Sequence, residues 1–161
     1  MIALFKRWFG RASPTLAEAS ARDAPAIAKL HGQSFQRGWS DGEVEALLRD
    51  RTVLGHRALA GGRLAGFIMS RIAAGEAEIL SIAVGHAYQG RGLARQMLDL
   101  HLRRLAGLGV EAVFLEVGED NEPAKKLYAR AGFQEVARRA NYYPAPGGKH
   151  RAALVFRRNL V

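Results

Sequence analysis

The segment with the most distinctive chemistry is glycine-rich and reads Gln89-Gly90-Arg91-Gly92-Leu93-Ala94. It follows an apolar run typical of a strand and precedes apolar residues at helical spacing, so it opens a helix. Backbone N–H groups at the start of a helix have no partner within it, and glycine lets an anion approach them closely. The segment is therefore predicted to bind a phosphate or a pyrophosphate, or else to be a turn required only for packing.

Three familiar motifs do not apply to this chain. Residues 85–92 have the Walker spacing but end in Arg91-Gly92, and the Gly90-Arg91-Gly92 run lacks the third glycine of a dinucleotide-binding loop. Residues 38–42 match the serine-hydrolase elbow, but no strand precedes them and Ser40 is placed to cap a helix. Nucleotide hydrolysis, NAD binding and a serine nucleophile are therefore not expected.

Three further side chains are candidates for chemistry. Glu116 lies near the end of an apolar strand, on the face that also holds Ala112 and Phe114. Burial there would raise its pKa toward neutrality and suit a general base, whereas a glutamate at a strand end can equally face water. Tyr128 and Asn121 belong to the next predicted helix, where the ordinary roles are a buried ring and a helix cap.

The composition limits the class of protein. The 161 residues fit one domain, and 24 Lys+Arg against 15 Asp+Glu give a net charge of +9, which favours acidic partners. The absence of cysteine excludes disulfides, a thiolate zinc site and a cysteine nucleophile, and agrees with a cytoplasmic location. The five histidines are scattered without metal-ligand spacing, so no metal is expected.

The chain is expected to consist of an N-terminal extension, residues 1–14, and a domain, residues 15–161. The extension mixes apolar and basic residues and is too short and interrupted for a secretory signal. No apolar run approaches the roughly 20 residues of a membrane span.

The periodicity of the domain predicts an α+β fold with helices on both faces of a sheet. Helices are expected to begin at Asp23, Ser40, Gly92 and Asn121. Strands are expected at residues 57–60, 64–70, 78–84, 110–117, 133–140 and 152–157, with residues 141–148 in a loop.

These motifs together resemble the GNAT acetyltransferases, and within them the RimI-type ribosomal-protein alanine N-acetyltransferases. The resemblance covers about residues 15–161, including Phe35, Trp39 and Ser40. It is carried by Ile82-Ala83-Val84, the 89–94 loop, Leu115-Glu116-Val117, Asn121, Leu127-Tyr128, Gly132-Phe133 and Asn141-Tyr142-Tyr143-Pro144. It implies the GNAT fold, with a mixed central sheet.

The resemblance also implies acetyl-CoA as co-substrate and direct attack of an amine on its thioester. The implied cofactor-binding residues are Ile82, Ala83, Val84, Gln89, Gly90, Arg91, Gly92, Leu93, Ala94, Arg95 and Asn121. Glu116 would be the base and Tyr128 the acid. The acceptor, the N-terminus of a ribosomal protein, would be bound by Trp39, Asn141, Tyr142 and Tyr143.

The sequence departs from the family pattern at two places within the domain. Gly118 stands where the family usually has arginine, and His150-Arg151 replaces the usual acidic residue before the last strand. Residues 130–161 are also strongly basic, which suggests either a solvated face or a weak contact with ribosomal RNA. Two alternatives remain: acetylation of a small-molecule amine, and a non-catalytic module that binds CoA or RNA.

Overall fold

The computed structural model describes residues 13–144, 146–148 and 150–161, and for residues 141–144 and 146 it describes the backbone only. The strands are β1 (Thr15–Glu18), β2 (Val53–Ala60), β3 (Arg63–Ala73), β4 (Glu76–Val84), β5 (Ala112–Gly118), β6 (Gln134–Pro144) and β7 (His150–Asn159). The helices are α1 (Ala24–Ser34), α2 (Asp41–Arg49), α3 (Leu93–Gly107) and α4 (Glu122–Arg130). Short 3-10 turns lie at Ala21–Asp23, His86–Tyr88 and Pro146–Gly148.

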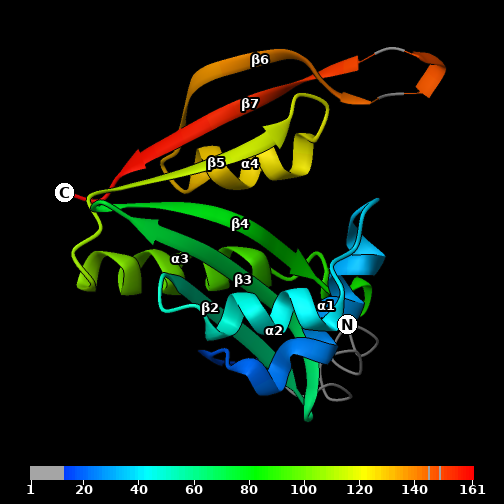
Figure 1. Ribbon diagram of the computed structural model, residues 1–161, viewed down its shortest axis with the longest axis vertical. Coiled ribbons are helices and arrows are strands. Elements are labelled where there is room, and N and C mark those ends of the chain that lie inside the picture. The colour runs from blue at the N-terminus through cyan, green and yellow to red at the C-terminus, as the bar shows by residue number, and fades with distance from the viewer. Residues whose placement is uncertain (1–12, 145, 149) are drawn as a thin grey trace, which may run out of the picture.

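The strands form one sheet in the order β1-β2-β3-β4-β5-β7-β6 (Figure 1). All neighbouring pairs are antiparallel except β4 and β5, which are parallel. The parallel pairing covers only Glu76–Glu78 of β4 against Ala112–Phe114 of β5. Beyond these residues the two strands separate, and their carboxyl ends, 82–84 and 116–118, diverge (Figure 1).

A β-bulge lies in β4 just beyond Glu78, where the two strands begin to separate. Met69 pairs with Ser81 and Ser70 pairs with Ile79, so Leu80 has no partner in β3. Because side chains alternate along a strand, one extra residue moves the side chains that follow it to the opposite face of the sheet. Ile79 accordingly packs with the cluster around α3, whereas Ala83 packs with the cluster around α1.

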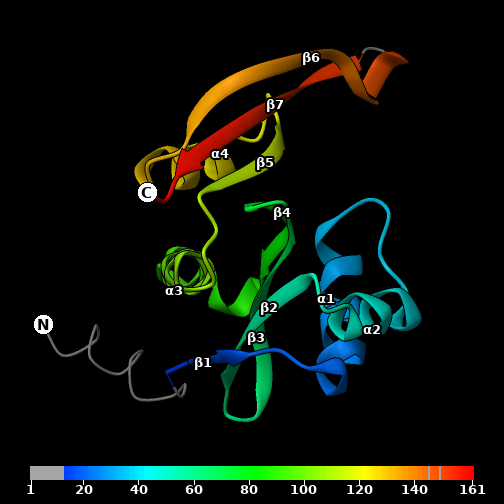
Figure 2. The same ribbon diagram turned by 60° about the vertical axis from the view of Figure 1, so that its left-hand side comes forward.

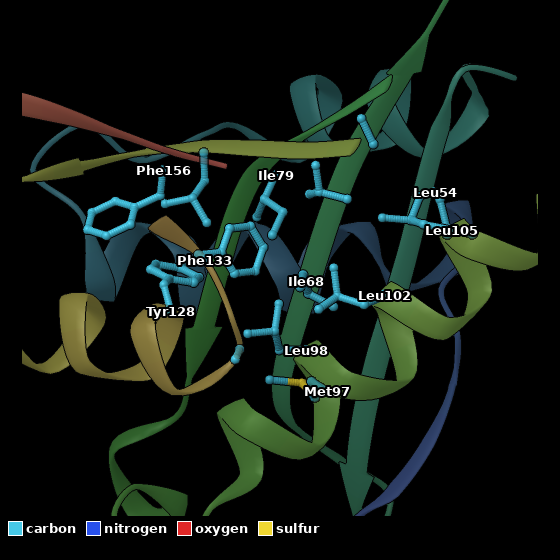
Figure 3. Packing of buried hydrophobic residues seen from close by; sticks show 14 of the residues in the cluster. Leu54, Ile68, Ile79, Met97, Leu98, Leu102, Leu105, Tyr128, Phe133 and Phe156 are labelled. Atoms are coloured by element: carbon cyan, nitrogen blue, oxygen red, sulfur yellow. The ribbon is translucent and has the colours of Figure 1, made fainter. Parts of the chain in front are cut away.

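Helices cover both faces of the sheet, as the sequence predicted (Figure 2). On one face α3 and α4 bury the main cluster, which includes Ile68, Leu98, Tyr128 and Phe156 (Figure 3). On the other face α1 and α2 bury a smaller cluster with Ile27, Val44, Phe67 and Met69. The mixed sheet and the two helical layers confirm the predicted fold class.

The predicted strands differ from the structure at several places, among them β2, which begins at Val53 instead of residue 57. The strand β1 was not predicted because it has only four residues and shows no sustained alternation; it is held by pairing with β2. Residues 141–144 were expected in a loop, but their backbone continues β6, and Tyr143 pairs with Arg151. Pro144 is compatible with a strand here because β6 is at the edge of the sheet, where one N–H needs no partner.

Candidate active site

The predicted anion-binding loop lines a cavity of about 460 Å³ at the carboxyl end of β4. The cavity lies between this loop and α4. Its lining residues are Val84, Tyr88, Gln89, Gly90, Gly92, Leu93, Ala94, Arg95, Pro123, Lys126, Leu127 and Arg130. The structure therefore brings together the strand end and the loop that the sequence pointed to, and adds α4 as a wall.

The backbone of the loop requires glycine at two positions. Gly90 and Gly92 have φ values of 74° and 78°, in the left-handed region that other residues avoid. The Gln89 side chain donates a hydrogen bond of 3.0 Å to the Val84 carbonyl, which ties the loop to the end of β4. Gly92 caps α3, so the N–H groups of the first helical turn begin at this loop.

The charges around the cavity suit a phosphorylated ligand. Arg95, Lys126 and Arg130 all line it, and the positive end of the α3 dipole points toward the loop. Arg95 also pairs with Asp99 at 2.9 Å. Asn121 caps α4 by accepting a hydrogen bond of 3.3 Å from the Ala124 N–H, which confirms the ordinary role considered for this residue.

Glu116 faces a second cavity, of about 360 Å³. Val113, Leu115 and Val117 of β5 are buried in the main cluster with α3 and α4, so Glu116 points to the opposite face of the sheet. Its side chain is 27% exposed and pairs with Arg139 of β6, with 3.4 Å between the guanidinium and the carboxylate. Glu78, Phe114 and Arg139 line the same cavity.

Tyr128 is buried on the other side of β5. It is 5% exposed and packs edge to face on Phe133, with ring centroids 5.6 Å apart, and beside Phe156 (Figure 3). Burial raises the pKa of its phenol above the ordinary value, so the hydroxyl keeps its proton throughout the physiological range. Within the part of the chain that is described, Tyr128 is not among the residues that line either cavity.

The acceptor residues expected from the resemblance are only partly described. Trp39 stacks on His31 with ring centroids 4.0 Å apart, and its backbone N–H donates to His31 Nδ1 at 3.1 Å. Burial lowers the pKa of His31, which favours the neutral ring that can accept this bond. The side chains of Asn141, Tyr142 and Tyr143 lie outside the described residues, and their predicted role stays a prediction.

Much of the basic C-terminal region is occupied by contacts within the protein. Arg138, Arg139 and Arg151 pair with Glu119, Glu116 and Asp120. Arg158 donates to the Ala131 carbonyl at the end of α4, and Arg157 lies over the Phe114 ring. These basic side chains are thus engaged within the fold, and no observation on the described residues supports a contact with RNA.

The described residues contain neither a cluster of metal ligands nor a helix that could span a membrane. No group of three or more His, Asp or Glu side chains is arranged to hold a metal ion. No helix there has the length and apolar character to cross a membrane.

Comparison with known proteins places this geometry in a family. The model of the acetyltransferase (GNAT) family matches residues 24–133. The ribosomal protein bS18-alanine N-acetyltransferase of Escherichia coli (strain K12) is 30% identical over 141 residues, which are 88% of this chain and 95% of that protein. The enzyme with the same name from Haemophilus influenzae is 31% identical over 140 residues, 87% of this chain and 94% of that protein.

Solved structures of acetyltransferases have a similar fold. The crystal structure of the ribosomal-protein-S18-alanine N-acetyltransferase from Escherichia coli has a TM-score of 0.85 and 28% identity, and the match covers 92% of this chain and 94% of that chain. Arabidopsis thaliana NAA60 in complex with acetyl-CoA has a TM-score of 0.81 at 20% identity, over 91% of this chain and 98% of that chain, which shows the shared fold. This chain belongs to the GNAT acetyltransferase family and is an acetyl-CoA-dependent N-acetyltransferase.

Proposed function

We propose that the enzyme transfers an acetyl group from acetyl-CoA to the N-terminal α-amine of a ribosomal protein, with Glu116 as base and Tyr128 as acid. The observation that carries this proposal is the position of the two side chains on opposite faces of β5, the strand that separates from β4 beyond Phe114. A proton can thus be taken from the amine on one face and supplied to the leaving group on the other.

The residues around the first cavity fit acetyl-CoA. The loop 89–95 and the first turn of α3 would hold the pyrophosphate through backbone N–H groups, with Arg95, Lys126 and Arg130 adding positive charge. The strand end Ile82-Ala83-Val84 lies at the divergence of β4 from β5, and Asn121, at the start of α4, would contact the cofactor arm. When bound, acetyl-CoA supplies a thioester that an amine can attack directly.

Glu116 is placed to accept the proton of an incoming ammonium group. Its carboxylate lines the second cavity, on the side of the sheet away from α3 and α4. The neighbouring guanidinium of Arg139 orients one carboxylate oxygen. General base catalysis of this kind contributes roughly 10²–10⁴-fold to a rate.

Tyr128 is the proposed proton donor, and its ring is buried on the α3 and α4 side of β5. Its high pKa ensures that the phenol is protonated before the reaction, as an acid must be. A thiolate is a less basic leaving group than an amine, so it departs with little assistance from a general acid.

An N-terminal α-amine is the acceptor that this single carboxylate serves best. Its pKa of about 7.7–8.0 leaves roughly a tenth of it neutral at pH 7, whereas a lysine amine, at about 10.4, is several hundredfold less neutral. The curated relatives named above act on the alanine of ribosomal protein bS18, and we extend this acceptor class to the present enzyme. A ribosomal acceptor also requires that the enzyme act in the cytoplasm.

A peptide that begins with alanine and contains internal lysines tests the proposal. Incubation with acetyl-CoA, followed by tandem mass spectrometry, should locate the acetyl group on the α-amine. The matched control is the same peptide with a blocked N-terminus, which should not be modified. Modification mainly at lysine, or turnover only with small amines such as polyamines or aminoglycosides, would reject the α-amine as acceptor, and no turnover at all would favour a non-catalytic module.

A further inference from the structure

The turn at residues 118–121 joins the two elements that carry the proposed acid and base. Gly118 ends β5 two residues after Glu116, and Asn121 caps α4, which carries Tyr128. Any shift of this turn therefore changes the position of both groups. The contacts that hold the turn are consequently of interest for catalysis.

Glu119 of this turn is tied to the β6–β7 hairpin and to α4. Its N–H donates to the Ala152 carbonyl at 3.0 Å, and its carboxylate accepts from the Ala152 N–H at 2.9 Å and from Arg138. Its carbonyl accepts from Lys125 of α4 at 2.9 Å. The Ala152 amide and the Arg138 guanidinium hold the pKa of the Glu119 carboxyl below its usual value.

Asp120, the next residue, is held by Arg151 of β7, the chain neighbour of Ala152. Both of its carboxylate oxygens accept from Arg151 Nη1, at 2.9 and 3.1 Å. A Cβ atom at Gly118 would lie 3.1 Å from Asp120 Oδ1 and 3.6 Å from Arg151 Nε. The ion pair therefore lies directly over Gly118, and two positions that depart from the family pattern, 118 and 151, are neighbours in space.

We propose that the Arg151–Asp120 pair is a positioning device, which holds the 118–121 turn against the β6–β7 hairpin and so fixes Glu116 relative to the bound acceptor. This inference rests on the proposed function, because it assigns Glu116 to the base. Arg151 pairs in register with Tyr143, within the segment expected to contact the acceptor. The absence of a side chain at Gly118 leaves the space in which the guanidinium of Arg151 lies.

The exposure of the Arg151–Asp120 pair makes a positioning role distinguishable from a contribution to folding stability. The side chains of Arg151 and Asp120 are 35% and 57% exposed, and ion pairs with such exposure contribute little to folding stability. Loss of the pair should consequently alter the reaction with the acceptor while the folded protein and its affinity for CoA are retained. A purely structural role would move the melting temperature instead.

A double-mutant cycle tests the inference with the variants Arg151→Gln, Asp120→Asn and the double variant. Each single change should lower kcat/KM for the acceptor about tenfold, below the roughly hundredfold cost of a 1 Å misplacement of reacting groups. The double variant should be no worse than the poorer single variant, because the two side chains act as one unit. The Kd for CoA and the melting temperature should stay within error of wild type.

The control is Arg49→Gln, which removes an exposed ion pair of similar length, Arg49–Glu45 at 2.9 Å on α2. It should leave kcat/KM unchanged. Unchanged kinetics in both single variants, or multiplicative losses in the double variant, would overturn the inference. The assay uses whichever acceptor the wild-type enzyme modifies. If that acceptor is not an α-amine, the proposed function fails while the positioning role can still be tested. An enzyme inert to every acceptor would reject both proposals.

Discussion

At the scale of single residues, the chemistry depends on which face of β5 a side chain occupies. Leu115 and Val117 point into the main cluster, so alternation places Glu116 on the opposite face of the strand. There it pairs with Arg139. Tyr128 reaches β5 from the other side, where burial raises the pKa of its phenol. The strand itself thus separates the proposed base from the proposed acid.

Removing either group should lower turnover without loss of cofactor binding. Glu116→Gln keeps the shape of the side chain but cannot accept a proton, so kcat should fall about 10²–10⁴-fold. Tyr128→Phe keeps the ring that packs on Phe133 and removes the hydroxyl, so kcat should fall while the fold is retained. Steady-state kinetics across pH 6 to 9 and calorimetry with CoA measure both effects.

Glu135→Gln is the matched control for the first variant, because Glu135 is an exposed glutamate of β6 that lines neither cavity among the described residues. It should have wild-type kinetics. Wild-type turnover of both Glu116→Gln and Tyr128→Phe over the whole pH range would show that the two roles are wrongly assigned.

Local roles of single residues, such as helix caps, could be predicted from the sequence, but contacts between distant residues could not. Ser40 and Asn121 were recognised as helix caps from local spacing, and both accept the expected backbone hydrogen bonds. Arg139 as a partner of Glu116, and His31 beneath Trp39, were not foreseen. Such contacts join residues far apart in the chain and depend on strand order and helix packing, which local patterns do not contain.

At the scale of elements, the junction of β4 and α3 is the feature on which the proposed cofactor site depends. The loop has two glycines in the left-handed region, and it leads directly into the first turn of α3. A side chain at Gly92 would combine backbone strain with steric and electrostatic exclusion of a phosphate.

Gly92→Glu should therefore abolish CoA binding. The control is Gly62→Glu in the β2–β3 turn, because Gly62 has the same φ of 78° and equally open surroundings. Both variants should lose similar stability from strain, but only Gly92→Glu should lose affinity in calorimetry with CoA. Equal affinity of the two variants would show that the loop does not hold the pyrophosphate.

Elements with strong periodicity were predicted closely, and elements defined by their partners were not. The α3 helix and the core of β5 follow from apolar spacing alone. The last residues of β6 contain Asn141 and Pro144, which are typical of turns, yet pairing with β7 extends the strand through them. The β4 bulge is likewise invisible in the sequence, because it exists only relative to β3.

At the scale of the whole molecule, a buried polar network connects β2, β3 and α3. His56 of β2 and His101 of α3 share a hydrogen bond of 2.7 Å between their Nδ1 atoms. His101 Nε2 also lies 2.7 Å from the hydroxyl of Ser70 of β3. Each contact is satisfied while the rings are neutral, but two protonated rings would bring two N–H groups against each other.

Burial lowers the pKa of both rings, that of His101 to about 3. The groups that face His56 act in opposite directions: Glu18 of β1 raises its pKa, and Arg104 of α3 lowers it. In the unfolded chain each histidine titrates near 6.5, so below that pH the unfolded state binds more protons than the folded state. The stabilising contribution of the neutral rings is therefore complete above about pH 6.5 and is lost as the pH falls.

Between pH 8 and pH 5 the free energy of unfolding should fall by about 2 kcal/mol for each ring that remains neutral in the folded protein. Chemical denaturation at several pH values measures the change. The range lies above the titration of Asp50, Glu119 and Glu122, whose pKa values are lowered by their hydrogen bonds and ion pairs, so these carboxylates do not contribute. His101→Gln should weaken the pH dependence, whereas the exposed His86→Gln should keep it. A wild-type stability that is flat over this range, or a His101→Gln variant with the full wild-type loss, would contradict the assignment of the network as acid-sensitive.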